Sequence, residues 1–490
     1  MAFWSSTLHY VPLRRLVGVA FFSMLLCATR AAGQHAPSSP DRPWHSSEEQ
    51  EFKSEMRLSS NGASPIDPAK TYSLPELINL AEIQNPETRE AWEQTRAHAA
   101  ILGIAKSELY PILAATAVAE INRREAFSHV SFYRQTVADT EGGLALSYTV
   151  FDFGARAGRI SAAKADVLAA NFAFNDTHRQ VIFEVEMAYY SLLNAEGQIS
   201  AAEANLTNAL AVQRAAEDRL NQGLATSPDV LEARSAAAQA EYELQALQGT
   251  KEISRGNLAR ALGILPTSSI QVQPLDELVI PVSFSNTVEQ SIDRAFEQRP
   301  DLMQQLAEVR AAEAQINEAR ATYYPTLSFS ASAGPRSFYA SQQSLPWEHT
   351  ANWGGGAGLS LTWSLFDGGA RRHKLAQAKA DALGSEAKAK ATRDSVANEV
   401  WTAYSKFRTA FRERQAAVEL LAAARQSYAA ALESYNHGVR SLLDVTAAQR
   451  TLAQARSSDV LARTAILSSV AELAFQTGSS IQSKAPKKEP

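Results

Sequence analysis

Alternating apolar and polar positions predict β-strands in two matching parts of the chain. In "TLSFSASA", Leu327 and Phe329 fall on one face and the serines between them on the other. "GLSLTWSLF", further along, alternates in the same way, and "GLALSYTVF" in the first half resembles it. Period-two alternation over about ten residues predicts a strand with one apolar and one polar face. We therefore expect strand pairs over about residues 112–151 and about residues 325–366.

A second pattern, with apolar positions three and four residues apart, occupies most of the remaining chain. Between Ala155 and Asn221 there is no proline. The apolar steps there are Ile160, Ala163, Val167, Ala170 and Phe174. This spacing predicts coiled-coil packing, and a continuous helix over these residues would be about 100 Å long. We expect long helical hairpins over about residues 155–262 and about residues 370–477.

The whole pattern occurs twice. Motifs in the second half follow their counterparts in the same order, 214 or 215 residues later. These pairs include Pro86 and Pro300, Pro111 and Pro325, Tyr189 and Tyr404, and Gly223 and Gly438. Self-similarity at a fixed offset is the signature of duplication. The prediction is a tandem repeat, with a first copy over 72–263, an inter-repeat linker over 264–286 and a second copy over 287–478.

The matching motifs "FDFGAR" and "FDGGAR" lie where each strand pair ends and each long helix begins. Asp152 and Asp367 are expected to cap helix amides there, because aspartate is a favoured N-cap residue. Gly154 and Gly369 are expected to adopt the backbone angles of the turn, which glycine tolerates.

Two strand pairs per chain limit the possible architectures. A soluble sandwich would bury the apolar strand faces in a core, but four strands are too few for a sandwich of useful size. They are also too few to close a membrane barrel, which starts at about eight strands. Several chains that pool their strands would be enough.

The N-terminus has the features of an export signal. Arg14 and Arg15 precede an apolar run from Val17 to Ala28, and small residues follow. We expect a signal peptide over residues 1–33. The run is too short to span a bilayer as a helix.

Cys27 raises the alternative of a lipid-modified terminus, although Leu26 stands where such signals carry a small residue. Residues 34–71 are rich in Pro, Ser and Glu and are expected to form a flexible linker. The tail, residues 479–490, is expected to be disordered.

Composition excludes several classes of function. The net charge of −5 gives no reason to expect nucleic-acid binding. A single cysteine excludes an intrachain disulfide and a cysteine-based metal site, and the nine histidines include no pair at i, i+4 spacing. Neither a Ser-His-Asp order nor a phosphate-binding loop is present. We expect no cofactor, no metal and no enzymatic activity.

These features together resemble the TolC family of outer-membrane efflux proteins, over about residues 72–478. The resemblance rests on the duplication, the Tyr-Pro pairs that open the strands, the "FDGGAR" exits, and the paired tips "NQGLATSPDVLEA" and "YNHGVRSLLDVTAAQ". It implies a mixed α/β membrane protein and a homotrimer. Three chains of four strands would form a twelve-stranded antiparallel β-barrel, and their helices a long α-helical coiled-coil barrel.

The resemblance also implies function and partners. The protein would lie in the outer membrane of a Gram-negative type bacterium, in contact with outer-membrane lipid, with its helices in the periplasm. It would export substrates from the periplasm or from an inner-membrane transporter of the RND, ABC or MFS type. A periplasmic adaptor protein would open it at the helix tips.

The family's periplasmic gate corresponds to Asp229, Tyr435, Arg440 and Asp444. By this resemblance, Tyr435 and Arg440 would bond to the tip around Asp229, and Asp444 would form an acidic ring. Family members often carry a second acidic residue three positions on, where this chain has Ala447. Helix capping is the simpler alternative for both aspartates.

The tips also provide candidate docking positions for the adaptor. These are the small and apolar residues Gly223, Leu224, Gly438 and Val439. A periplasmic coiled-coil adaptor, or a structural protein of an export complex, is the alternative function. An adaptor would require a single hairpin flanked by compact β domains, and a purely structural coiled-coil protein would leave the alternating strands without a role.

Overall fold

The two halves of the computed structural model contain the same series of elements with the same helix lengths. The structure describes residues 66–128, 131–279, 287–342 and 346–479. The signal peptide, Cys27, the linker up to residue 65, part of the inter-repeat linker and the tail from residue 480 lie outside the described residues.

Each half begins with a helix of 11 residues and one of 22, and ends with a helix of 67 and one of 35. In the first half the elements are α3 (Leu74–Gln84), α4 (Pro86–Ser107), β2 (Ile112–Ser128), β3 (Ser131–Phe151), α5 (Ala155–Asn221) and α6 (Ser227–Ala261). In the second they are α7 (Val288–Gln298), α8 (Pro300–Ala321), β5 (Thr326–Gln342), β6 (Glu348–Thr362), α9 (Ala370–Asn436) and α10 (Leu442–Gln476). The pairs of equal length are what the repeated sequence predicts.

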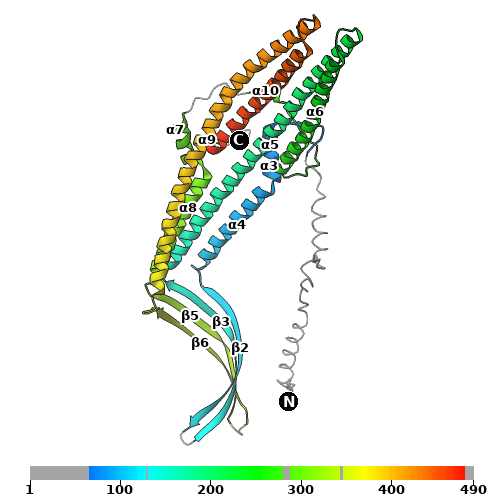
Figure 1. The fold of residues 1–490 in the computed structure, drawn as a ribbon. Helices are drawn as coiled ribbons and strands as arrows, with labels where there is room; N and C mark the ends of the chain where they lie inside the picture. Colours follow the sequence, from blue (N-terminus) through cyan, green and yellow to red (C-terminus); the bar gives the residue numbers. More distant parts are fainter. Residues whose placement is uncertain (1–65, 129–130, 280–286, 343–345, 480–490) are drawn as a thin grey trace, which may run out of the picture. The chain divides into compact units, whose positions relative to one another are not determined.

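The four long strands form one antiparallel sheet in the order β2-β3-β5-β6. It extends from the end of the helices at which α5 and α9 begin (Figure 1). Where β3 pairs with β5, Gly143 and Gly334 allow the two backbones to approach closely. A Cβ added at Gly334 would lie 1.9 Å from the carbonyl oxygen of Gly142. Strands β2 and β6 are the sheet edges, and their apolar side chains, such as Val118 and Leu361, are exposed.

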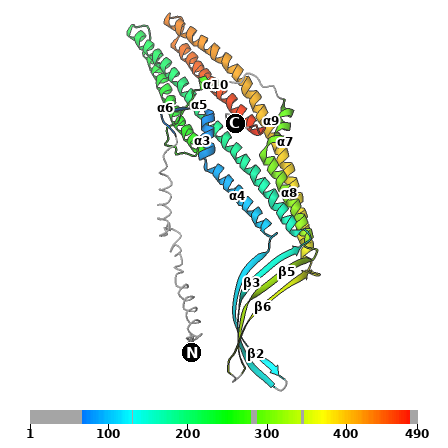
Figure 2. The same cartoon turned by 180° about the vertical axis from the view of Figure 1, so that it is seen from behind.

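The helices pack as two hairpins, α5 with α6 and α9 with α10, and α10 also packs against α5 (Figures 1 and 2). A large core cluster lies midway along the hairpins, around Val185, Tyr189, Leu258 and Ile466. A second cluster lies nearer the tips, where alanines such as Ala216 and Ala233 allow close helix approach. No helix among the described residues is both long and apolar enough to cross a membrane.

Two expected boundaries differ from the structure. The alternation in "GLSLTWSLF" continues to Leu365, but β6 ends at Thr362, because the chain turns there toward α9.

The last residues of the expected N-terminal linker belong to the fold. Ile66 is buried in the first core cluster, and β1 (Thr71–Tyr72) pairs in parallel with β4 (Gln271–Val272).

Strand β4 lies within the expected inter-repeat linker, residues 264–286. Besides β4, it contains the 3-10 helix η2 (Leu275–Glu277), and Ile270 is buried in the same cluster as Ile66. The apolar residues Ile66 and Ile270 are covered because both segments pack on the helices. Composition alone could not distinguish them from solvated linker.

Candidate functional site

Each hairpin reverses direction at a tip built on a left-handed glycine. Gly223 has φ 73° and Gly438 has φ 75°, a region that glycine enters without a steric penalty. The amide of Leu224 donates to the carbonyl of Arg219 at 2.8 Å, and that of Val439 to Ser434 at 2.8 Å. Each of these bonds spans six residues and closes the end of the helix in a Schellman motif. It leaves the side chains of Leu224 and Val439 exposed at the two tips.

Asp229 and Asp444 lie in the first turns of the returning helices. Asp229 accepts hydrogen bonds from the hydroxyl and amide of Thr226, at 2.7 and 2.8 Å. Asp444 accepts the equivalent bonds from Ser441, at 2.8 and 3.1 Å. These bonds hold the pKa of each carboxyl below its ordinary value, because they stabilise the ionised form. Both aspartates thus act in helix capping, but as the N3 partners in capping boxes: the N-cap residues are Thr226 and Ser441, not the aspartates themselves as the helix-capping alternative expected.

Tyr435 is buried between the two hairpins, and its main partner is Arg219. The guanidinium of Arg219 lies over the Tyr435 ring, 4.6 Å from its centroid, and also donates to the Tyr435 carbonyl oxygen. Burial raises the pKa of the Tyr435 phenol, and the nearby Asp229 charge adds to this while Arg219 opposes it. Arg219 thus binds the last turn of α9 from the opposite hairpin.

The bonds expected from Tyr435 and Arg440 to the tip around Asp229 are not found in the described chain. The Tyr435 hydroxyl is buried without a hydrogen-bond partner there. Arg440 is exposed, and its charge helps to lower the pKa of Asp444 on its own tip. Within one chain, the Asp229 carboxylate accepts bonds from Thr226 of its own tip.

At the other end of the long helices, the two strand exits have matching geometry. Asp152 accepts from the amides of Gly154 and Arg156, and its carboxylate also pairs with the Arg156 guanidinium at 3.0 Å. Gly154 has φ 97°. The arginine further donates to the carbonyl of Val150 at the end of β3. It thereby holds strand and helix at a fixed angle.

The second exit repeats this arrangement residue by residue. Asp367 accepts from the amides of Gly369 and Arg371, and pairs with the Arg371 guanidinium at 2.7 Å. Gly369 has φ 90°. The arginines of "FDFGAR" and "FDGGAR" are therefore as much part of the turn as the aspartates.

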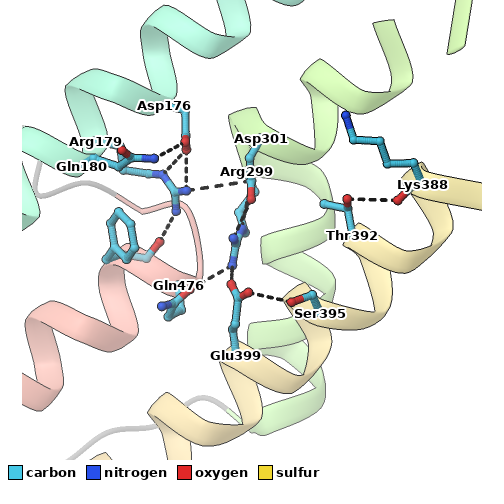
Figure 3. Close-up of polar contacts among 11 residues, drawn as sticks. Asp176, Arg179, Gln180, Arg299, Asp301, Lys388, Thr392, Ser395, Glu399 and Gln476 are labelled. Atoms are coloured by element: carbon cyan, nitrogen blue, oxygen red, sulfur yellow. Dashed lines mark hydrogen bonds and ion pairs between the residues drawn. The ribbon is translucent and has the colours of Figure 1, made fainter. Parts of the chain in front are cut away.

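A buried cationic joint lies where α7 meets α8 (Figure 3). Arg299, the N-cap residue of α8, is 4% exposed. Its guanidinium donates to Asp301, to Glu399 of α9 at 2.7 Å and to the Gln476 side chain of α10 at 2.9 Å. One side chain therefore ties three helices of the second repeat together.

Next to it, Arg179 of α5 connects the first repeat to the second. Its guanidinium pairs with Asp176, donates to the carbonyl of Phe475 and lies 3.9 Å from Asp301 (Figure 3). The counterpart of Arg299 in the first repeat is Asn85, which caps α4 and donates to the carbonyl of Ala261 at 3.0 Å. The same joint is thus neutral in one repeat and ionic in the other.

The described residues contain no group of three or more His, Cys, Asp or Glu side chains that could hold a metal ion.

Comparison with known proteins agrees with this doubled architecture. The family model described as "Outer membrane efflux protein" matches the chain twice, over residues 77–264 and 291–479. The chain belongs to this outer membrane efflux family.

Relatives extend over most of the chain. It is 29% identical over 403 residues to Protein CyaE of Bordetella pertussis, covering 81% of this chain and 82% of CyaE. It is 23% identical over 421 residues to Outer membrane protein TolC of Escherichia coli, covering 83% and 82%. The structure of the outer-membrane channel OprN superposes with a TM-score of 0.73 at 20% identity, over 92% of this chain and 99% of that one.

The expected relation to the TolC family is thus confirmed, and with it the function and location. This outer membrane efflux protein is a channel of the outer membrane that exports substrates. The alternative of an adaptor or a structural coiled-coil protein is set aside.

Sequence reasoning missed Arg219 and Arg299. Both break the repeat: Arg219 corresponds to Ser434, and Arg299 to Asn85. The sequence did offer one signal for them: each is a charged residue whose counterpart in the other repeat is neutral.

Proposed function

We propose that three copies of this chain form the export channel and that their twelve strands close into one β-barrel. The main support is that α9 lacks neighbours that its repeat counterpart has. Helix α5 packs against α8 and α10 of the following repeat. Within the described chain, α9 packs against α7, α8 and α10 but has no following repeat to contact. Helices α4 and α6 of a second copy would provide the missing contacts to α9.

The surface of α4 fits that role. Its side chains Ile101 and Ile104 are 49% and 67% exposed. They occupy positions equivalent to Gln315 and Glu318 of α8, and Glu318 lies against Gly158 of α5. The exposed edges of β2 and β6 would pair in the same assembly, since an unpaired edge is a template for another strand. The six repeats of three copies would close the ring. The activity of the assembled channel would be transport, with no chemical step.

The gate in this proposal lies at the periplasmic helix tips. Tyr435 and Arg219 join the two hairpins of one copy. Arg440, exposed and without a bond to the other tip in the described chain, would pair with Asp229 or Asp444 of a neighbouring copy. Three Asp444 carboxylates around one axis would form an acidic constriction.

A periplasmic adaptor would open this gate by docking at the tips. Leu224 and Val439 are 64% and 79% exposed beside Gly223 and Gly438, so each tip presents one apolar side chain. An apolar side chain on a rigid turn suits a protein contact that is desolvated on binding. The adaptor would connect the channel to an inner-membrane transporter of the RND, ABC or MFS type.

Single-channel conductance in planar bilayers tests the proposal. The wild-type protein is expected to give small, cation-selective currents. Arg440→Ser should increase their amplitude and open time, because the ionic contact between copies is lost. Lys390→Ser, which removes an exposed cation on α9 far from the tips, is the control and should leave the currents unchanged.

Native mass spectrometry of the same samples reports the number of copies. Trimers with equal currents for both variants would keep the channel but remove Arg440 from the gate. A monomer, or trimers without current, would contradict the proposed assembly.

A further inference from the structure

A cluster of basic residues directly follows the second strand exit. The first turn of α9 carries Arg371, Arg372, His373 and Lys374. Arg371 is used inside the turn, where it pairs with Asp367. Arg372 and Lys374 are exposed, and in the described part of the chain neither forms an ion pair.

The first repeat shows what a cation at the position of Lys374 does when it has partners. The equivalent residue, Arg159, pairs with Glu108 on one side and with Glu318 of α8 on the other, the latter at 3.1 Å. The counterparts of these two acids are Thr322, in this chain, and Ile104, in the α4 of a neighbouring copy. Lys374 therefore meets no carboxylate at either place in the proposed trimer.

Arg372 also has no partner in the proposed trimer, but for a different reason. Its equivalent in the first repeat is Ala157, which is exposed even though α4 and α8 flank α5 there. A side chain at this position points away from the neighbouring helices. Trimer formation by the same packing would leave Arg372 on a free surface.

The surroundings of the cluster have the chemistry of a membrane boundary. Trp363, Leu365 and Phe366, immediately before the turn, are all more than half exposed. The Trp363 indole donates to the Tyr323 carbonyl at 3.1 Å, and the Arg371 guanidinium lies 5.6 Å from the Tyr323 ring. Aromatic side chains collect at the level of lipid headgroups. Lys374 follows Arg371 at i, i+3 and so shares its helix face.

We propose that Arg372 and Lys374, on different faces of the first turns of α9, each bind the phosphate of an anionic phospholipid headgroup at the periplasmic surface of the outer membrane. Each is an unpaired cation that closely follows exposed aromatic and aliphatic side chains, a combination that matches a ligand with an acyl chain and a phosphate. Basic residues near an anionic bilayer surface each contribute to such binding. The inference rests on the channel's membrane location and on the proposed trimer, and it gives the second repeat a role that the first does not have.

Native mass spectrometry of the full-length protein tests the site. The protein is reconstituted with equal amounts of phosphatidylglycerol and phosphatidylcholine, and the lipids retained by each trimer are counted. Wild type should retain phosphatidylglycerol preferentially. Arg372→Gln with Lys374→Gln should reduce that preference by about 5-fold at each of the two positions, since one basic residue contributes about 5-fold.

The control variant, Lys390→Gln with Arg425→Gln, removes two exposed charges further along α9 and should keep the wild-type preference. Equal retention of both lipids by wild type, or an unchanged preference in the Arg372 and Lys374 variant, would overturn the site. So would a change in ion selectivity with unchanged lipid preference, because the cluster would then face the channel interior. Loss of bilayer current in wild type would count against the proposed channel assembly, while the retained lipids still report on the site.

Discussion

The guanidinium of Arg219 covers the ring of Tyr435 and also binds the carbonyl oxygen of the same residue. Arg219 belongs to the last turn of α5, and Tyr435 to the last turn of α9. A cation near a helix C-terminus is favourable because the last carbonyls lack partners there. One side chain of the first hairpin therefore both packs on and caps the second.

Replacing this arginine should loosen the tips. Arg219→Ala removes a cation–π contact, worth about 0.5–2 kcal/mol, and a charge-assisted hydrogen bond, worth about 1.5–3 kcal/mol. We expect longer and larger openings in planar bilayers. Tyr435→Phe keeps the ring, and its lost hydroxyl has no partner in the described chain, so its currents should stay near wild type. A large effect of Tyr435→Phe with none of Arg219→Ala would instead indicate that the hydroxyl bonds to another copy.

The charge of Asp444 should control ion selectivity over a wide pH range. Hydrogen bonds from Ser441 lower the pKa of this carboxyl, so it stays ionised in mildly acidic solution and its charge is lost only as the pH falls through the lowered value. Reversal potentials under a salt gradient should therefore show cation selectivity that persists into acid. Asp444→Asn should reduce the selectivity at neutral pH.

Ser441→Ala should shift that titration to higher pH, because it removes the hydroxyl that donates to Asp444 at 2.8 Å. Thr226→Ala changes the equivalent bond to Asp229 and is the matched control for the other tip. If only Thr226→Ala shifts the titration, Asp229 and not Asp444 forms the acidic constriction.

The elements of this fold could be predicted because their patterns are local. The limits of the long helices are visible in the chain: "FDFGAR" and "FDGGAR" mark where α5 and α9 begin, and Gly223 and Gly438 mark where they have ended. Helix periodicity does not reveal which side chains meet across elements. The Arg219–Tyr435 contact joins residues 216 positions apart, and nothing near either residue indicates the other.

The gate residues illustrate the same limit. Asp229 and Asp444 follow Thr226 and Ser441 by three residues, so their capping role is a local pattern that the sequence does predict. The expected bonds from Tyr435 and Arg440 depend on how two hairpins, and two copies, face each other. The burial of Ile66, which was expected in a flexible linker, could not be predicted for the same reason, because it depends on helices distant in sequence.

The ionic joint at Arg299 should matter more for stability than its neutral counterpart at Asn85. Arg299→Ala removes the buried partner of Asp301 and Glu399, and should cost about 3 kcal/mol, the low end of the range for breaking a buried ion pair, because both acids are partly exposed and Asp301 keeps Arg179 nearby. Asn85→Ala removes a buried amide bond to Ala261 and should cost about 1–3 kcal/mol. Thermal unfolding in detergent measures both.

Lys388→Ala is the control for the joint, since Lys388 forms an exposed pair with Glu308 that is worth about 1 kcal/mol or less. High salt should weaken that exposed pair and leave the buried Arg299 joint nearly unaffected. Equal melting shifts for Arg299→Ala and Lys388→Ala would show that the joint adds no particular stability.

Glu186 should make the stability of the channel fall between mildly acidic and neutral pH. Its side chain lies in α5, is 4% exposed and has one carboxyl oxygen without a hydrogen-bond partner in the described chain. Burial raises its pKa from 4.5 to about 7. Between these values the folded protein holds a proton that the unfolded chain has released, so the free energy of unfolding decreases as the pH rises.

The decrease should reach about 3 kcal/mol once the pH passes the raised pKa, at about 1.4 kcal/mol for each unit. Glu186→Gln cannot ionise, so its melting temperature should depend less on pH and exceed that of wild type above neutral pH. Glu184→Gln, on the same helix with a side chain that is 41% exposed, should keep the wild-type pH dependence. Parallel pH profiles for wild type and Glu186→Gln would mean that this carboxyl is charged or solvated in the folded trimer.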